Sequence, residues 1–159
     1  MKSWPEPVER VAAYLRERGI DSRLEEFLES APTAAGAAEA IGCALEEIVK
    51  SLVFICDGLP YLVLVPGHRR ADPSKVSAAA GAGYARSASP EEVRSATGFE
   101  PGAVAPFPAP NVARVFCDRE LLRVSMVWAG AGSPRHVVGL ASTDVVRLTN
   151  AEITDLTEA

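Results

Sequence analysis

The chain has 159 residues, a length that suits one domain of ordinary size with its own hydrophobic core. Its formal net charge of −5 argues against a general polyanion binder such as a DNA-binding protein, although an acidic body can still carry a local basic cleft. Hydrophobic residues make up 48% of the chain but aromatic residues only 6%, so we expect a core of aliphatic side chains and alanine.

The first half of the chain shows both helical and strand patterns. Apolar residues at helical spacing predict amphipathic helices, and short apolar runs bounded by turn residues predict buried strands. In chain order, the expected elements are a helix over Pro5–Arg18, an edge strand over Arg23–Phe27, a helix over Ala34–Ile41, a strand over Val49–Cys56, a return strand over Tyr61–Val65 and a helix from Pro73 to about Ala80.

The second half begins with shorter elements and contains a proline-rich segment. Residues 100–111 hold four prolines, so we expect a long irregular loop, and loops of that length are often functional. The expected elements are a strand over Tyr84–Ser87, a helix from Pro90 to about Thr97, strands over Ala113–Cys117, Val124–Trp128 and Val137–Leu140, and a helix over Thr143–Leu148.

The strands are expected to pair as hairpins. Asp57-Gly58 between two apolar runs is a strong hairpin signal, although Leu59-Pro60 predict a turn longer than two residues. Neither an internal repeat nor a linker divides the chain. We therefore predict one domain over residues 1–159 of the α/β class (α+β type), in which helices wrap a mixed, mainly antiparallel sheet.

Cysteine and histidine usage bears on metals, redox state and compartment. Cys43, Cys56 and Cys117 are odd in number, widely spaced and free of a Cys-x-x-Cys motif, which argues against a disulfide framework and a zinc site. With no visible ligand cluster, we predict no metal and no cofactor. Residues 1–7 lack the apolar core of a signal peptide, and no apolar run approaches a membrane span, so we expect a cytoplasmic protein with no membrane partner.

Lys50 is the only charged residue in the apolar run Val49–Cys56. Lysine is rarely buried unless it is paired. If Lys50 faces a cleft, its ammonium offers a compact charge and a donor to an anion or a carbonyl. The alternative is a lysine at the strand edge whose ammonium reaches water, and the residues alone leave both open.

Three cationic or ionisable side chains follow the next strand at a Pro-Gly break. They are His68, Arg69 and Arg70. Such a cluster can contact phosphate groups, which positions a protein on nucleic acid. The alternative is an ordinary solvated turn, because these residue types are mostly exposed.

The segment Gly130-Ala131-Gly132-Ser133-Pro134 lies between two apolar strands. Its glycines permit positive φ and close approach of another molecule, so we expect a rigid turn whose N–H groups form a cradle for an anion or a carbonyl. A tight turn without a ligand is the alternative. The third glycine of a dinucleotide loop is absent and a strand follows, which excludes that motif.

His136 lies three residues after Ser133. Nucleophilic catalysis by a serine and a histidine requires a hydrogen bond between them and an acid that orients the histidine. The chain has no Gly-x-Ser-x-Gly motif, and no third partner is visible near the pair. These absences argue against a serine hydrolase.

Five motifs in this order make the chain from about Thr33 to its C-terminus resemble the YbaK/prolyl-tRNA synthetase-associated domain family. The motifs are Ile48–Phe54, Leu64–Gly67, Ala88–Val93, Thr97–Gly102 and Gly130–Pro134. The resemblance implies a mixed sheet wrapped by helices and hydrolysis of the ester that joins a wrong amino acid to the tRNA 3′ end.

The same resemblance implies roles for particular residues. Lys50 matches the functional lysine of the family, and the segment from Gly130 to Pro134 matches its Gly-x-x-x-Pro substrate loop. We therefore expect Lys50, Gly130, Gly132 and Ser133 to be catalytic. The expected substrate-binding residues are these four together with Ala131, Pro134, His68, Arg69, Arg70 and His136.

The expected partner is the acceptor end of a mischarged aminoacyl-tRNA, with an aminoacyl-tRNA synthetase as a candidate second partner. Free-standing trans-editing of tRNA-Pro or a similar tRNA is the first hypothesis. The alternative is a module of the same fold that binds a tRNA end or a small ligand without turnover. The sequence leaves open the amino acid removed, the attacking group (water or the ribose hydroxyl), the role of His136, and whether the protein is a monomer or a homodimer.

Overall fold

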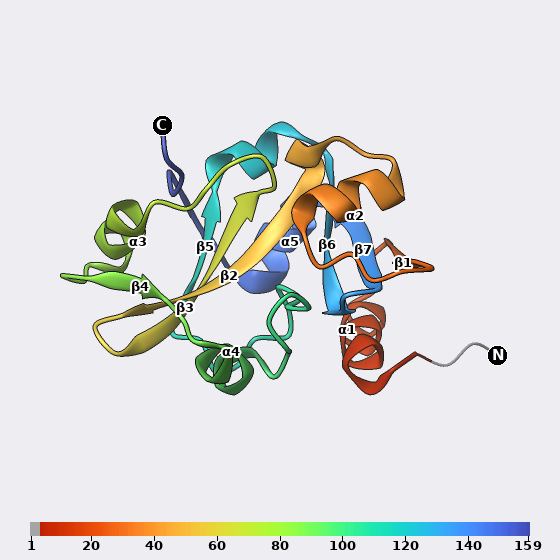
Figure 1. Cartoon of the computed structure of the whole chain (residues 1–159), viewed down its shortest axis with the longest axis horizontal. Helices are drawn as coiled ribbons and strands as arrows, with labels where there is room; N and C mark the ends of the chain where they lie inside the picture. Colours follow the sequence, from red (N-terminus) through yellow and green to blue (C-terminus); the bar gives the residue numbers. More distant parts are fainter. Residues whose placement is uncertain (1–3) are drawn as a thin grey trace.

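An eight-stranded mixed sheet is the central element of residues 4–159, which are the residues that this computed structural model describes (Figure 1). Its strand order is β1-β7-β6-β2-β3-β5-β8, and β4 pairs with the far end of β2. The strands are β1 (Ser22–Glu26), β2 (Ile48–Cys56), β3 (Leu59–Pro66), β4 (Ala85–Ser87), β5 (Val115–Asp118), β6 (Met126–Ser133), β7 (His136–Ala141) and β8 (Glu152–Thr154).

The helices pack on both faces of this sheet (Figure 1). The core around α1 and α5 covers one face, α3 packs on the other, and α2 covers the end of the sheet near β6 and β7. The helices are α1 (Glu6–Glu17), α2 (Ala34–Ile41), α3 (Pro73–Ala80), α4 (Pro90–Thr97) and α5 (Ser142–Thr149), with 3₁₀ turns η1 (Leu45–Glu47) and η2 (Arg119–Arg123).

The sheet confirms the predicted fold class. Antiparallel pairing joins β1 to β7, β2 to β3, β2 to β4 and β6 to β7. Parallel pairing joins β2 to β6, β3 to β5 and β5 to β8. The domain is therefore a mixed α/β fold in which antiparallel pairs hold a narrow majority.

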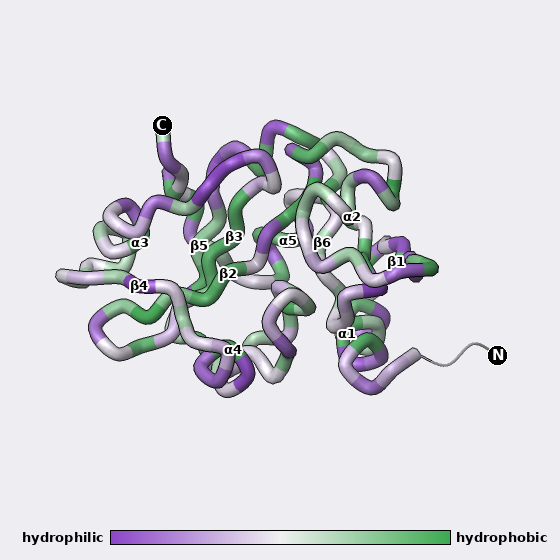
Figure 2. The backbone as a smooth tube through the Cα atoms, viewed as in Figure 1, coloured by the Kyte–Doolittle hydropathy of each residue, from purple (hydrophilic) through white to green (hydrophobic). Residues whose placement is uncertain are grey.

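The β2–β3 hairpin is the central pair of the sheet, and β3 is buried on both faces. Its alternate side chains enter two different cores, Leu62 and Leu64 on one face and Val63 and Val65 on the other. This two-sided burial explains the continuous apolar run, which Figure 2 shows as green colour along the middle of the sheet.

The turn of this hairpin is shorter than expected. Cys56 pairs directly with Leu59, so Asp57 and Gly58 form a two-residue turn with φ values of 49° and 85°. The positive φ at both positions matches the twist of the flanking strands. The prediction of a longer turn was wrong because Leu59 and Pro60 already belong to β3.

Two further sequence expectations differ from the structure in the second half of the chain. Strand β6 begins at Met126 rather than at the expected Val124, because Val124 is the C-cap residue of η2. The strand also continues past the expected end at Trp128, to Ser133. Strand β8 was missed because it is only three residues long and its single aliphatic side chain, Ile153, is 46% exposed. Its pairing with β5 comes from the tertiary fold rather than from a local pattern.

The three cysteines are unpaired, and Cys56 and Cys117 are buried. Burial raises the pKa of the Cys117 thiol to about 12, and the neighbouring Asp118 adds to this shift. Of the segment 1–7 that lacks a signal-peptide core, residues 1–3 lie outside the described residues. None of the helices within residues 4–159 is long and apolar enough to cross a membrane.

Candidate active site

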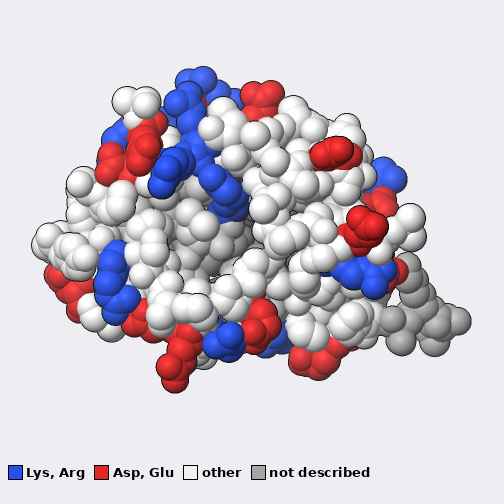
Figure 3. All heavy atoms as spheres, in the orientation of Figure 1, with Lys and Arg blue, Asp and Glu red and all other residues white. Residues whose placement is uncertain are grey.

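A pocket opens where the parallel strands β2 and β6 separate. They pair only at Ile48–Trp128 and Val49–Ala129 and then diverge (Figure 1). The space beyond these pairs is a cavity of about 300 Å³, which opens on the face of the molecule that Figure 3 shows as hollowed. Because its walls are strands of the central sheet, the position of the cavity follows from the sheet topology.

Most of the pocket wall is apolar and small. The segment before α2 and α2 itself contribute Ala31, Ala34 and Ala37, and the strands contribute Trp128 and Val137. The proline-rich segment 100–111 also reaches the pocket, through Gly102 and Val104, and a functional role for this long loop stays a prediction. A wall of this composition suits a small organic group.

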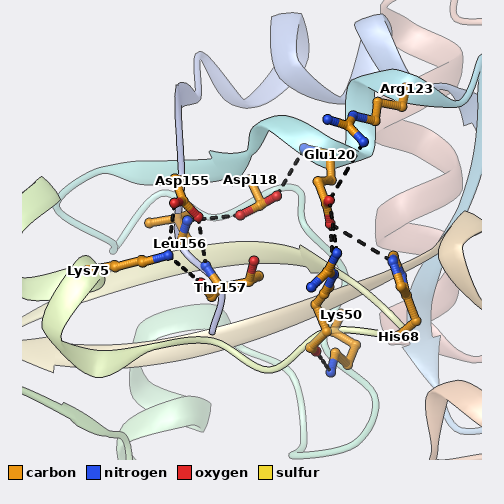
Figure 4. A network of polar contacts seen from close by, with 10 residues as sticks. Lys50, His68, Lys75, Asp118, Glu120, Arg123, Asp155, Leu156 and Thr157 are labelled. Carbon is orange, nitrogen blue, oxygen red and sulfur yellow. Dashed lines mark hydrogen bonds and ion pairs between the residues drawn. The ribbon is translucent and has the colours of Figure 1, made fainter. Parts of the chain in front are cut away.

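Lys50 lies on the β2 side of this pocket. Its Nζ donates a hydrogen bond to the backbone carbonyl of Arg69, in the turn that follows β3 (Figure 4). Burial lowers the pKa of the Lys50 ammonium below its ordinary value, and the positive charge of Arg70 lowers it further. Lys50 is thus a half-buried cation at a cavity wall rather than a strand-edge lysine that reaches open water.

On the β6 side, Gly130, Ser133 and Pro134 line the same pocket. A Cβ at Gly130 would lie 2.6 Å from the carbonyl oxygen of Val104, so only glycine lets the proline-rich segment close the cavity at this point. The pairing of β6 with β7 shifts register between Gly130 and Ser133, which marks a β-bulge. The expected turn over Gly130–Pro134 was wrong, because β6 continues to Ser133 and Ser133 pairs with His136.

The two middle residues of the segment face away from the pocket. Ala131 is fully buried in the core that packs against α1. Gly132 has a φ of 101°, and a Cβ there would lie 2.8 Å from the carbonyl carbon and oxygen of Pro7. The structure therefore brings Gly130, Ser133 and Pro134 to the pocket with Lys50, whereas Ala131 and Gly132 hold β6 against the start of α1.

The side chains of His68, Arg69 and Arg70 are absent from the pocket wall. Arg69 Nε lies 3.0 Å from Glu120 Oε2, and His68 Nε2 lies 3.9 Å from the same oxygen (Figure 4). Glu120 thereby anchors the turn whose carbonyl binds Lys50. Figure 3 shows lysine and arginine side chains gathered beside the hollow, near this turn and η2, so the turn contributes to a basic rim.

His136 is buried and lines the pocket beside Ser133. Its Nδ1 lies 2.6 Å from Ser133 Oγ, and its Nε2 lies 3.5 Å from Glu26 Oε2. The expectation that the pair has no acidic third partner was wrong. Glu26 belongs to the predicted edge strand, but its proximity depends on the pairing of β1 with β7, which no local sequence pattern reveals.

Metal ligands are not clustered in the described part of the chain. Within residues 4–159, no group of three or more His, Cys, Asp or Glu side chains is placed to hold a metal ion. The absence of a metal requirement stays a prediction.

The fold and the pocket define a class of protein that comparison with known proteins identifies. Residues 29–148 match the model of the aminoacyl-tRNA editing domain family, and the chain belongs to this family. The earlier resemblance to the YbaK/prolyl-tRNA synthetase-associated domain family is thereby confirmed.

The relatives differ in how much of their own length this chain covers. Protein YwhH of Bacillus subtilis (strain 168) is 32% identical over 125 residues, which are 79% of this chain and 80% of YwhH. The proline–tRNA ligase of Nitratidesulfovibrio vulgaris (strain DP4) is 37% identical over 81 residues, which are 51% of this chain but only 14% of the ligase. A solved structure, "Crystal structure of a putative trans-editing enzyme for prolyl tRNA synthetase", superposes with a TM-score of 0.91 at 37% identity, covering 99% of this chain and 100% of that one.

Proposed function

We propose that this protein is a free-standing aminoacyl-tRNA deacylase that hydrolyses the ester of mischarged tRNA-Pro or a similar tRNA in the cytoplasm. The observation that carries the proposal is the meeting of Lys50 with Gly130, Ser133 and Pro134 at one pocket. Family membership and the match to a solved structure described as a trans-editing enzyme support it. In this proposal residues 1–159 act as one editing domain.

The proposed mechanism relies on the reactivity of the substrate. An aminoacyl ester is already activated, so a strong protein nucleophile is not obligatory. In the first route, water attacks the carbonyl carbon and loses a proton, and the bond to the esterified ribose oxygen breaks as that oxygen gains a proton. In the second route, the neighbouring ribose hydroxyl attacks first, which only moves the ester to its own oxygen, and water then cleaves the new ester in the same way. The backbone N–H groups of Gly130 and Ser133, which line the pocket at the two ends of the bulge, are the proposed donors to the developing oxyanion, and one such donor typically contributes about 2.7–4 kcal/mol.

Lys50 is proposed to bind the acceptor end of the tRNA. Its ammonium is a point charge that suits a phosphate or carbonyl oxygen, and the Arg69 carbonyl fixes its direction. The basic rim formed by the turn at residues 68–70 would contact the neighbouring backbone phosphates.

A deacylation screen tests the proposal. The protein is mixed with tRNA-Pro charged in turn with each small amino acid, and loss of the ester is followed over time beside a sample without protein. We expect accelerated hydrolysis of at least one mischarged species and none of correctly charged prolyl-tRNA. Tight binding of charged tRNA with no acceleration for any amino acid would instead identify the non-catalytic binding module.

Binding of tRNA is expected to weaken with salt along a shallow slope. Only about two to four phosphates can be neutralised by Lys50 and the turn at residues 68–70, and each contributes about one unit to the slope of log K against log salt. Arg70→Ala should reduce that slope by about one unit, whereas Arg16→Ala on α1 should leave it unchanged. A slope that corresponds to ten or more contacts would contradict a footprint confined to the acceptor end.

A further inference from the structure

Three residues form a row across adjacent strands on one side of the pocket. His136 on β7 is the direct register partner of both Glu26 on β1 and Ser133 on β6. Directly opposite residues of antiparallel strands project from the same face of a sheet. We name these residues the Glu26–His136–Ser133 row.

The geometry of the row favours one arrangement of the protons on His136 and Ser133. The Glu26 carboxylate, 3.5 Å from His136 Nε2, favours a proton on that nitrogen and leaves Nδ1 as an acceptor. In this tautomer the Ser133 hydroxyl is the donor and His136 Nδ1 the acceptor of the hydrogen bond that joins them over 2.6 Å. Because the His136 side chain is only 4% exposed, bulk water competes little for this bond.

A second hydrogen bond orients the oxygen of Ser133. The backbone N–H of Arg135 donates to Ser133 Oγ over 3.0 Å. With its own proton given to His136 and one lone pair used by Arg135, the hydroxyl oxygen can accept one more hydrogen bond. Ser133 lines the pocket, so this remaining acceptor is available to a donor within the cavity.

The polar groups of the pocket wall match the two ends of an aminoacyl-tRNA terminus. Lys50, on the β2 side, is a cation suited to phosphate or carbonyl oxygen. On the other side, Ser133 and His136 line the pocket, whereas the Glu26 carboxylate is absent from its wall and lies 3.5 Å from His136 Nε2 and 3.9 Å from Arg135 Nη2. An aminoacyl ester carries its α-ammonium group away from the phosphates, so it can place that cation beside Ser133.

We propose that Ser133 accepts a hydrogen bond from the α-ammonium of the bound aminoacyl group, and that His136 and Glu26 are positioning residues that hold its hydroxyl for this task. The proposal rests on the proposed function for the identity of the ligand. It assigns the row to recognition of an amino acid as opposed to another acyl group. It also gives Ser133 a role other than nucleophile, because the lone pair that Arg135 leaves free on its oxygen would be occupied by the ammonium.

Binding of two stable analogues tests the proposal without requiring turnover. The probes are adenosine analogues in which a 3′-amide replaces the ester, one carrying L-alanine and the other L-lactate, which has a hydroxyl in place of the ammonium. We expect the wild-type protein to bind the alanyl analogue about tenfold to a hundredfold more tightly at neutral pH, the range typical of a hydrogen bond to a charged group. Ser133→Ala and Glu26→Gln should each remove most of that preference.

The matched control is Glu25→Gln. Glu25 is adjacent to Glu26 on β1, pairs with Arg23 and should leave the preference unchanged. Nitrogen NMR supplies a readout of positioning, and assignment is simple because the chain has two histidines. We expect wild-type His136 to carry its proton on Nε2 and Glu26→Gln to show a mixture of tautomers.

Three results would overturn the proposal: equal affinity of the wild-type protein for the two analogues, an unchanged preference and tautomer in Glu26→Gln, or an acyl group trapped on Ser133 during deacylation. The experiment also separates this inference from the proposed function. Preference for the alanyl analogue in a protein that hydrolyses no aminoacyl-tRNA would refute the deacylase and keep the row. Deacylation without any preference for the alanyl analogue would support the deacylase and refute the proposed role of the row.

Discussion

Replacing Lys50 with alanine is expected to abolish most deacylation while leaving the fold intact. The side chain lies at the pocket wall, and its half-buried ammonium donates a hydrogen bond to the carbonyl of Arg69. Loss of a buried charged contact typically costs about 2–5 kcal/mol, which corresponds to a fall in kcat/KM of at least about thirtyfold. Lys50→Met keeps most of the apolar stem and should show the same loss of activity.

Lys75→Ala is the matched control for this substitution. Lys75 on α3 also donates to a backbone carbonyl, that of Thr157, but it is absent from the pocket wall (Figure 4). The control should keep full activity, and the melting temperatures of all three variants should be compared with that of the wild type. Full activity in folded Lys50→Ala would sink the mechanism proposed here.

Gly132→Val is expected to unfold much of the protein rather than to disable a folded enzyme. Valine at a φ of 101° is strained by about 1–3 kcal/mol, and its Cβ would collide with the backbone of Pro7 at 2.8 Å, adding about 1–3 kcal/mol of overpacking. Urea denaturation should therefore show a loss of about 2–6 kcal/mol in the free energy of unfolding.

Gly58→Val shows how much stability is lost through backbone strain alone, without a steric clash. Gly58 also has a positive φ, 85°, but a Cβ there would meet no atom within 4 Å. Its loss of stability should be clearly smaller than that of Gly132→Val, and the residual activity of Gly132→Val should follow its folded fraction. A stable Gly132→Val protein without activity would contradict this structural role and indicate that Gly132 contributes to the binding site.

Local sequence patterns predict most of this fold because most of its helices and strands carry a signal of their own. Ser89 and Glu92 form the expected capping box of α4, with Ser89 Oγ accepting from the Glu92 N–H and Glu92 Oε1 accepting from the Ser89 N–H. Thr33 likewise caps α2. Such signals depend on residues three or four positions apart, which a single sequence displays directly.

The composition of the site depends on strand order, which a single sequence does not display. The resemblance to a family identified Lys50 and the Gly130–Pro134 segment, but not which of their atoms face the pocket. Glu26 and Glu120 acquire their roles through contacts with residues far along the chain, His136 and Arg69. Neither carboxylate lies in a recognisable motif, so only the assembled sheet reveals them.

The parting of β2 and β6 after two paired residues also bears on the selectivity of the site. A cavity between strands of a hydrogen-bonded sheet keeps a nearly constant size, because packed protein interiors deform little. Under the proposed function, an amino acid too bulky for this cavity would be rejected by steric repulsion, which has no upper limit. Smaller ones enter freely and lose only about 1–3 kcal/mol for each missing methylene. A cavity of constant size therefore excludes large side chains strictly but discriminates weakly among small ones. A correctly charged tRNA with a small amino acid would then need protection from hydrolysis by a feature outside this pocket.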